Sequence, residues 1–119
     1  MAYSQDLKNG KTSPIAATCV AGVTPEIDLE GGTLCGIFIE TELTSTYFTI
    51  SAARTASGVF CTIIDPNAAG ADMQFFIATT SDNEYVPISP LLTAGLRFIK
   101  INFDQSETPT IYIARRNLQ

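Results

Sequence analysis

The sequence predicts an all-β fold, an antiparallel sandwich or barrel of about eight strands in one domain. Short segments of about 4–8 residues, rich in β-branched and aromatic residues, recur at intervals of about 8–14 residues. Polar turns separate them, as in sandwiches and barrels. No segment carries the sustained 3.6-residue apolar period of an amphipathic helix. The length of 119 residues suits one domain with one sizeable core.

The first expected element is an extended N-terminal arm over residues 1–15, followed by the sandwich domain over residues 16–119. The arm is largely polar and shows neither a strand period nor a helix period before Ala16. A loosely held tail, the usual state of a chain terminus, is the alternative interpretation. About 14 extended residues span up to ~45 Å, so an arm of this length can reach a neighbouring molecule.

The first two expected strands are residues 25–32 and 33–40. In the first, Ile27 and Leu29 alternate with acidic residues and should face the core. The Gly31-Gly32 pair that follows is typical of a hairpin turn. The second segment is apolar almost throughout, which predicts burial on both of its faces.

The middle of the chain continues the same pattern. Residues 47–53 place Phe48 and Ile50 on one face of a strand. Two further strands are expected at residues 58–65 and 73–80, and each is followed by a turn that contains Asp and Asn.

A short strand and a helical turn come next. Residues 84–88 contain a proline, which has no amide hydrogen to donate and therefore predicts an edge or irregular strand. One helical turn is expected at residues 89–95. Ser89 can cap it, Pro90 suits the first helical position, and Gly95 can end it.

The last two strands are expected at residues 96–103 and 110–116. The first reads "LRFIKINF". One of its faces begins apolar and ends polar along the strand, whereas the other begins basic and ends apolar. The residues expected in the core are Ile99, Ile101 and Phe103. A bulge near Phe98 would also produce the exchange. Arg97 and Lys100 then lie at the rim, and we expect at least one of them to meet a carboxylate.

The charge pattern narrows the classes of partner. The net charge is −5, and the seven Lys and Arg residues form no basic cluster interleaved with aromatic residues, so nucleic acid is not expected as a partner. No apolar run approaches the roughly 18 residues that span a bilayer, and no signal peptide is recognisable, so we expect no membrane association and synthesis in the cytoplasm. Only 16% of the residues are charged, against about 25% in a typical chain. A surface covered by a partner would explain this, and so would a small β protein rich in Thr and Ser.

The residue types disfavour the commonest catalytic and metal sites. The chain has no histidine, which is the commonest general base and metal ligand. Cys19, Cys35 and Cys61 are widely spaced and form no CxxC pair, so we expect reduced, buried thiols and no zinc site. No glycine-rich phosphate loop occurs. We therefore expect a protein that is not an enzyme and binds no cofactor.

Two groups of polar residues are the alternatives for chemistry. Asp28 and Glu30 share one strand face, and Glu40 and Glu42 flank a turn. A carboxylate pair can serve a glycosidase, although solubilising charge is the simpler interpretation. Asp65, Asn67 and Asp72 surround a glycine-containing loop whose oxygen atoms would suit calcium. Their spacing is not that of an EF-hand, and Asp-Pro-Asn is an ordinary turn sequence, so we favour a turn. We predict no catalytic residue and no metal ligand.

Six short stretches follow one another in a definite order along residues 24–116. They are "IDLEGGTLCGIFI" (27–39), "FTIS" (48–51), "FCTIID" (60–65), "YVPISP" (85–90), "LRFIKI" (96–101) and "TIYIARR" (110–116). Their order and spacing resemble a class of small virion proteins of tailed bacteriophages, and also discoidin-like jelly-roll modules. The chain departs from the common "DLGG" pattern at Glu30, and it lacks the Trp-rich loops that often bind sugar or lipid in such modules.

The resemblance implies a jelly-roll sandwich on the outside of a phage capsid. It implies a decoration, or cement, protein that docks on the major capsid protein as a homo-oligomer, a dimer or a trimer, and bridges its subunits. The alternative is a carbohydrate-binding or adhesin module associated with a head or tail fibre. The candidate partner contacts are Tyr3, Leu7, Lys8, Lys11, Arg97, Lys100, Arg115 and Arg116.

Overall fold

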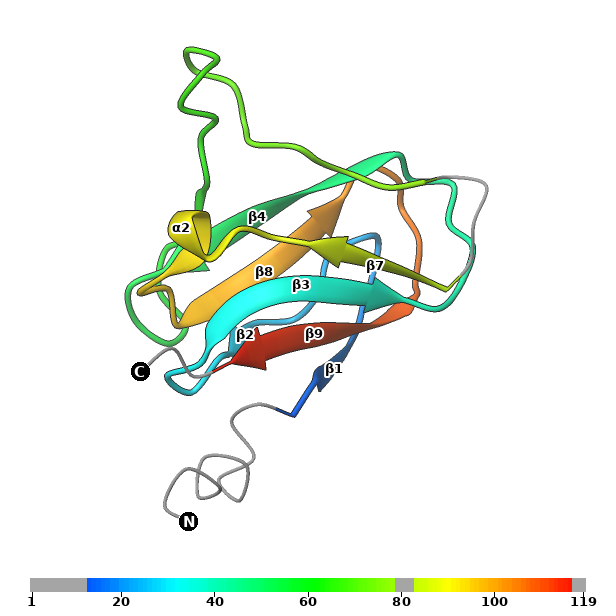
Figure 1. Ribbon diagram of the computed structural model, residues 1–119, viewed down its shortest axis with the longest axis horizontal. Helices are drawn as coiled ribbons and strands as arrows, with labels where there is room; N and C mark the ends of the chain where they lie inside the picture. The colour runs from blue at the N-terminus through cyan, green and yellow to red at the C-terminus, as the bar shows by residue number, and fades with distance from the viewer. Residues whose placement is uncertain (1–12, 79–82, 117–119) are drawn as a thin grey trace.

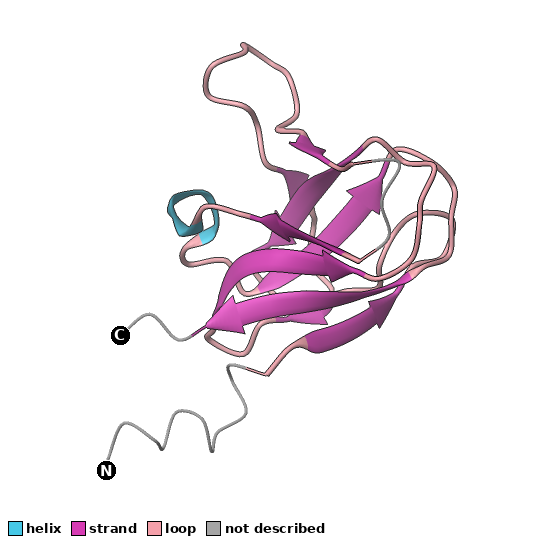
Figure 2. Ribbon diagram, turned by 45° about the vertical axis from the view of Figure 1, so that its right-hand side comes forward, coloured by secondary structure: helices cyan, strands magenta, loops and turns pink. Residues whose placement is uncertain are grey.

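The computed structural model describes residues 13–78 and 83–116 of the chain (Figure 1). Within this part, two antiparallel sheets face each other as a β-sandwich, which confirms the predicted all-β class (Figure 2). The described residues form nine strands, against about eight expected, and one helical turn. They include no helix long and apolar enough to cross a membrane. Most of the arm predicted over residues 1–15 lies outside the described residues.

The first sheet, sheet A, has the strand order β1-β9-β3-β7. Its strands are β1 (Ile15–Thr18), β9 (Thr110–Arg116), β3 (Thr33–Ile39) and β7 (Glu84–Pro87). β7 lies at one edge, as its proline predicts. β1 lies at the other edge and begins one residue before the predicted domain boundary.

The second sheet, sheet B, has the order β2-β8-β4-β5, and β6 also pairs with β4. Its strands are β2 (Ile27–Asp28), β8 (Phe98–Phe103), β4 (Tyr47–Ala53), β5 (Cys61–Thr62) and β6 (Phe75–Phe76). The longer strands predicted at residues 58–65 and 73–80 are therefore wrong. Only two residues of each pair with β4, because the chain between them leaves the sheet as a projecting loop (Figure 1).

The turn at Gly31 and Gly32 crosses between the sheets and does not form the expected hairpin. β2 belongs to sheet B, whereas β3 belongs to sheet A. Glu30 and Gly31 have positive φ angles of 55° and 87°, and the amide of Gly32 donates to the carbonyl of Leu29 over 2.9 Å. Two consecutive left-handed residues redirect the chain toward the other sheet, and a glycine meets that requirement without a steric penalty.

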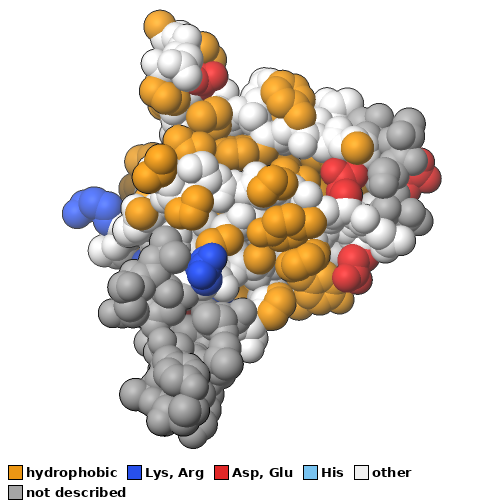
Figure 3. All heavy atoms as spheres, in the orientation of Figure 1, with side chains coloured by type: hydrophobic (Ala, Val, Ile, Leu, Met, Phe, Trp, Pro, Cys, Tyr) orange, Lys and Arg blue, Asp and Glu red, His pale blue; other side chains and the backbone are white. Residues whose placement is uncertain are grey.

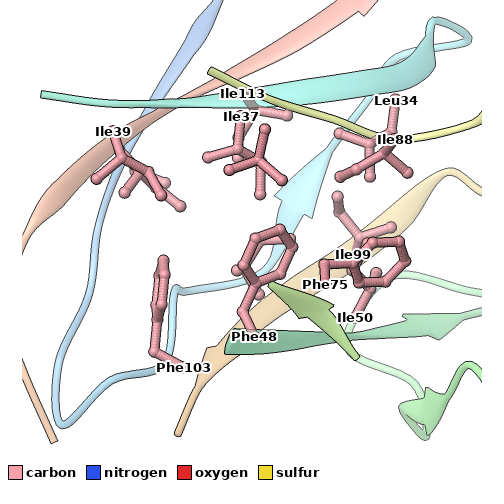
Figure 4. Packing of buried hydrophobic residues seen from close by; sticks show 14 of the residues in the cluster. Leu34, Ile37, Ile39, Phe48, Ile50, Phe75, Ile88, Ile99, Phe103 and Ile113 are labelled. Carbon is pink, nitrogen blue, oxygen red and sulfur yellow. The ribbon is translucent and has the colours of Figure 1, made fainter. Parts of the chain in front are cut away.

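Aliphatic side chains of sheet A meet three phenylalanines between the sheets. In Figure 4, Ile37, Ile39 and Ile113 point toward Phe48 and Phe103, while Phe75 stacks on Phe48 with 5.3 Å between the ring centroids. The predicted core residues of β8, namely Ile99, Ile101 and Phe103, are all buried. The pairing of β8 with β4 is uninterrupted, so there is no bulge near Phe98. The register shift lies in β3 instead, between Leu34 and Gly36.

The predicted helical turn is present as α2 (Pro90–Thr93). The hydroxyl of Ser89 accepts a hydrogen bond from the amide of Leu91 over 3.3 Å, and Pro90 takes the first helical position. Gly95 follows with a φ of 88°. The buried hydroxyl of Thr93 donates to the carbonyl of Leu34 over 2.9 Å, which ties α2 to β3.

Two carboxylates join the loops that cross between the sheets after β3 and after β8. Glu107 accepts hydrogen bonds from the amide of Thr44 (2.8 Å) and from the amide and hydroxyl of Ser45 (2.9 and 2.6 Å). Asp104 accepts from the amides of Thr46 (2.9 Å) and Tyr47 (3.3 Å). Burial alone would raise the pKa of each carboxyl group, but these hydrogen bonds outweigh it and lower both pKa values.

Candidate interaction face

The outer face of sheet A carries a row of residues, three of them aromatic, across its four strands. The register places Ala16 opposite Tyr112, Tyr112 opposite Phe38, and Phe38 opposite Tyr85. Side chains alternate between the faces of a sheet, so this row points away from the core that the intervening isoleucines fill. Phe38 is 38% exposed and Tyr85 is 43% exposed. The predicted burial of both faces of β3 is thus wrong, because sheet B covers only the inner one.

Tyr85 is held against the sheet by a close approach to Gly36. Its hydroxyl donates to the carbonyl of Cys35 over 3.1 Å, and a Cβ atom at Gly36 would collide with its phenol ring. The ring of Phe38 lies beside it, with 4.6 Å between the centroids and 47° between the planes. Burial raises the pKa of Tyr85, with a further contribution from Cys35, so the phenol remains a hydrogen-bond donor at neutral pH.

The rows on either side of these aromatic residues are also uncharged. Thr18 lies opposite Thr110, with 2.8 Å between their hydroxyl oxygens, and Gly36 lies opposite both Ala114 and Pro87. We call this surface the aromatic face; its members are Ala16, Thr18, Gly36, Phe38, Tyr85, Pro87, Thr110, Tyr112 and Ala114. Figure 3 shows hydrophobic side chains gathered over this side of the molecule, with acidic side chains at one margin and a basic side chain at the other.

The outer face of sheet B has a different character. Asp28 and Arg97 form an ion pair there, with Nε to Oδ1 at 2.8 Å and a second contact of 3.1 Å. This pair confirms that one of the two basic residues of the "LRFIKINF" segment meets a carboxylate, and the hydrogen bond from Arg97 lowers the pKa of Asp28. Lys100 lies 4.4 Å from the ring centroid of Phe60. Sheet B therefore presents an ion pair and a lysine to solvent, whereas on the outer side of sheet A the exposed Arg116 lies at the end of β9, next to the aromatic face.

The four predicted partner contacts that the structure describes do not gather on one surface. Tyr3, Leu7, Lys8 and Lys11 lie outside the described residues. Lys100 is on β8 of sheet B and Arg97 directly precedes that strand, whereas Arg115 and Arg116 end β9 in sheet A. Arg116 is exposed. Arg115 is 8% exposed and donates to the carbonyls of Ser13 and Leu29, both at 3.1 Å, which leaves little of its surface for a partner.

The candidate carboxylate sites are occupied by internal contacts. Asp28 holds Arg97, and Glu30 accepts a hydrogen bond from Arg115 over 3.0 Å. Asp65 accepts from the amide of Asn67 over 2.8 Å, as in the turn that we favoured over a calcium loop. Residues 13–78 and 83–116 contain no group of three or more His, Cys, Asp or Glu side chains that could hold a metal ion.

All three cysteines are free, but they differ in exposure. Cys19 is buried, Cys35 is half-buried and Cys61 is exposed. The predicted burial is therefore wrong for Cys61, because β5 is a two-residue strand at the edge of sheet B. Burial, and to a lesser degree the charge of Glu107, raises the pKa of Cys19 to about 11.

Comparisons of the chain with family models, with curated proteins and with solved structures found no match. Functional inference therefore depends on the residues and their geometry.

The aromatic face was not predicted from the sequence, since Phe38 was expected in the core. Its only local signal is the alternation "IYIA", which places Tyr112 between two buried isoleucines. The alignment of Tyr112 with Phe38 and Tyr85 follows from strand pairing.

Proposed function

We propose that this protein is a non-enzymatic virion component of a tailed bacteriophage that decorates the capsid exterior. It docks on the major capsid protein and bridges neighbouring subunits. The observation that carries the proposal is the aromatic face, because an exposed and uncharged apolar surface marks a site of interaction with another protein. The resemblance of residues 24–116 to small phage virion proteins supports this class of partner.

We also infer a jelly-roll arrangement for the sandwich. The first four strands along the chain alternate between the sheets, with β1 and β3 in sheet A and β2 and β4 in sheet B. The last two strands also divide between the sheets, since β8 lies beside β2 and β9 lies beside β1. This order supports two interlocked Greek keys, which is the topology of jelly rolls.

The size of the aromatic face supports a second contact from the arm. The two seven-residue strands β3 and β9 and the two four-residue strands β1 and β7, at ~3.3 Å per residue and ~4.8 Å spacing, cover roughly 350 Å² of flat sheet. A stable interface needs about 800 Å² of accessible surface from each partner. We propose that residues 1–14 add the remainder by pairing with a strand edge of a neighbour, and that several weak contacts in an oligomer act together.

Cosedimentation with capsid shells that lack the protein tests the proposal. We expect Phe38→Ser to weaken binding about tenfold or more, because the substituted side chain lies at the centre of the face. Phe76→Ser is the matched control, since Phe76 is a 69% exposed phenylalanine on sheet B. Equal binding by the wild type and the Phe38 variant would refute docking through this face.

A truncation tests the arm separately. We expect a chain without residues 1–14 to retain the folded sandwich, with an unchanged circular dichroism spectrum, and to lose binding to shells. Tight decoration by the truncated chain would remove the arm from the proposal. Light scattering of the full chain would check the expected dimer or trimer.

The alternative function, carbohydrate binding, draws on the same exposed aromatic side chains, because sugar rings stack on aromatic faces. The 47° tilt between Phe38 and Tyr85 disfavours a flat stacking platform, and the hydroxyl of Tyr85 is already engaged with Cys35. Saturable binding on a glycan array, lost in Tyr85→Ala and Tyr112→Ala, would favour this alternative over capsid docking.

A further inference from the structure

A groove of about 600 Å³ lies on the sandwich away from the aromatic face. It is bordered by the end of β4, the loop that follows it, β5, and the turn between α2 and β8. Ligand pockets commonly measure about 300–1,000 Å³, with mostly apolar walls and a few polar groups. Thr93 anchors one border of this groove through its bond to Leu34, so that border has a defined position.

The walls of the groove are largely apolar. Ala52, Ile63 and Leu96 line it and also pack against the core, so its floor is continuous with the interior of the protein. Val59 lines it from the loop and is 83% exposed. The exposed thiol-bearing residue Cys61 is also on the wall. An apolar occupant would remove this surface from water.

The charged residues that line the groove are both cationic. They are Arg54 and Arg97, and no Asp or Glu lines it, although the chain carries a net charge of −5. Arg97 is engaged by Asp28. Arg54 is exposed, and the described residues provide it with no ion pair. One guanidinium is therefore available to an anion at the rim of an apolar groove.

We propose that this groove binds a small amphiphilic anion, a molecule with an apolar body and one carboxylate or sulfonate group. The apolar body lies against Val59, Ile63 and Leu96, and the anionic group pairs with Arg54. The inference is independent of the capsid-docking proposal, because the aromatic face contributes none of the lining residues.

Two fluorescent probes that differ mainly in charge test the proposal on the full chain. They are 1-anilinonaphthalene-8-sulfonate and neutral N-phenyl-1-naphthylamine. We expect the sulfonate to bind one site saturably and about fivefold more tightly than the neutral probe. Arg54→Gln should remove that advantage and leave the neutral probe unchanged. Decanoate should displace the sulfonate at a concentration about fivefold lower than decanol. Arg116→Gln is the control, since it makes the same charge change on sheet A.

Protection of the exposed Cys61 from alkylation tests whether the probe binds in the groove. In a Cys35→Ser variant, we expect saturating sulfonate to slow alkylation of Cys61 at least fivefold, and Val59→Ser to weaken both probes by about fivefold. Equal affinities for the two probes, an equal loss with Arg116→Gln, or an alkylation rate of Cys61 that the sulfonate leaves unchanged would each overturn the proposal.

Discussion

Replacement of Glu107 by alanine should lower the stability of the sandwich, because its carboxylate supports the loop between β3 and β4. The side chain accepts three hydrogen bonds, from the amide of Thr44 and from the amide and hydroxyl of Ser45. Water can reach the amide of Thr44, but Ser45 is fully buried. The variant therefore leaves two donors of Ser45 without their acceptor inside the protein.

The magnitude follows from those two donors. An unsatisfied buried donor costs about 1–3 kcal/mol, and the two donors share one loop, so we expect a total near 3 kcal/mol for Glu107→Ala. A chain of 119 residues has an unfolding entropy of about 0.25 kcal/mol/K, so this loss corresponds to a fall in Tm of about 12 °C. Differential scanning calorimetry at pH 7 would measure it. Glu42→Gln, a loss of one charge at an exposed position in the same loop region, should shift Tm by less than about 2 °C.

The effect of Glu107 should also depend on pH. Its pKa in the folded state lies below the ordinary value of 4.5, so its contribution is fully present above that pH and is lost as the pH falls through the folded pKa. The difference in Tm between the wild type and Glu107→Gln should therefore shrink between pH 5 and pH 2. A difference that stays constant over this range, or equal Tm values for Glu107→Ala and Glu42→Gln, would refute the role assigned to the carboxylate.

Three further predictions concern individual contacts. Gly36→Ala should lower the free energy of unfolding in urea by about 1–2 kcal/mol, because it displaces Tyr85. In a Tyr85→Ala background the same change should be neutral or stabilising, because alanine suits a strand better than glycine. Equal losses in both backgrounds would contradict the contact. The pKa of Asp28, followed by NMR of its carboxyl carbon, should lie below 3.8 and rise toward that value in Arg97→Gln. Protonation of Asp28 in acid removes the stabilising ion pair from the wild type, and this acid-dependent loss of stability should be absent from the variant. An unchanged pKa would rule out Arg97 as the cause. At pH 8, iodoacetamide should modify Cys61 and leave Cys19 intact, since Cys19 is buried and its pKa of about 11 keeps it protonated. Denaturant should make all three cysteines reactive. Early labelling of Cys19 in the native protein, read by mass spectrometry, would contradict its burial.

Local patterns were sufficient wherever one segment carried its own signal. The alternation in "LRFIKINF" identified Ile99, Ile101 and Phe103 as core residues, and their burial confirms it. Serine, proline and glycine in "SPLLTAG" specified α2 through capping and a fixed proline φ angle, which depend only on neighbouring residues. The proline in β7 predicted an edge or irregular strand, because proline has no amide hydrogen to donate, and β7 lies at the edge of sheet A.

Tertiary structure decided the features that depend on which strands become neighbours. The Gly31-Gly32 turn has the composition of a hairpin, yet it crosses between sheets, because β2 gains its hydrogen bonds from β8 and β3 from β9 and β7. The groove beside Arg54 similarly forms only where residues 52–63 and residues 95–97, which are distant in the sequence, lie side by side.

The candidate interaction face shows the same division. The sequence by itself determined the all-β class, most of the core and the uncharged character of the strands. Only strand pairing brought Tyr112 and Tyr85 to either side of Phe38, and only the position of sheet B left that outer face uncovered. The physical reason is that a side-chain period of two residues fixes which residues share a face, whereas hydrogen bonds between distant strands fix which faces align and which one meets solvent.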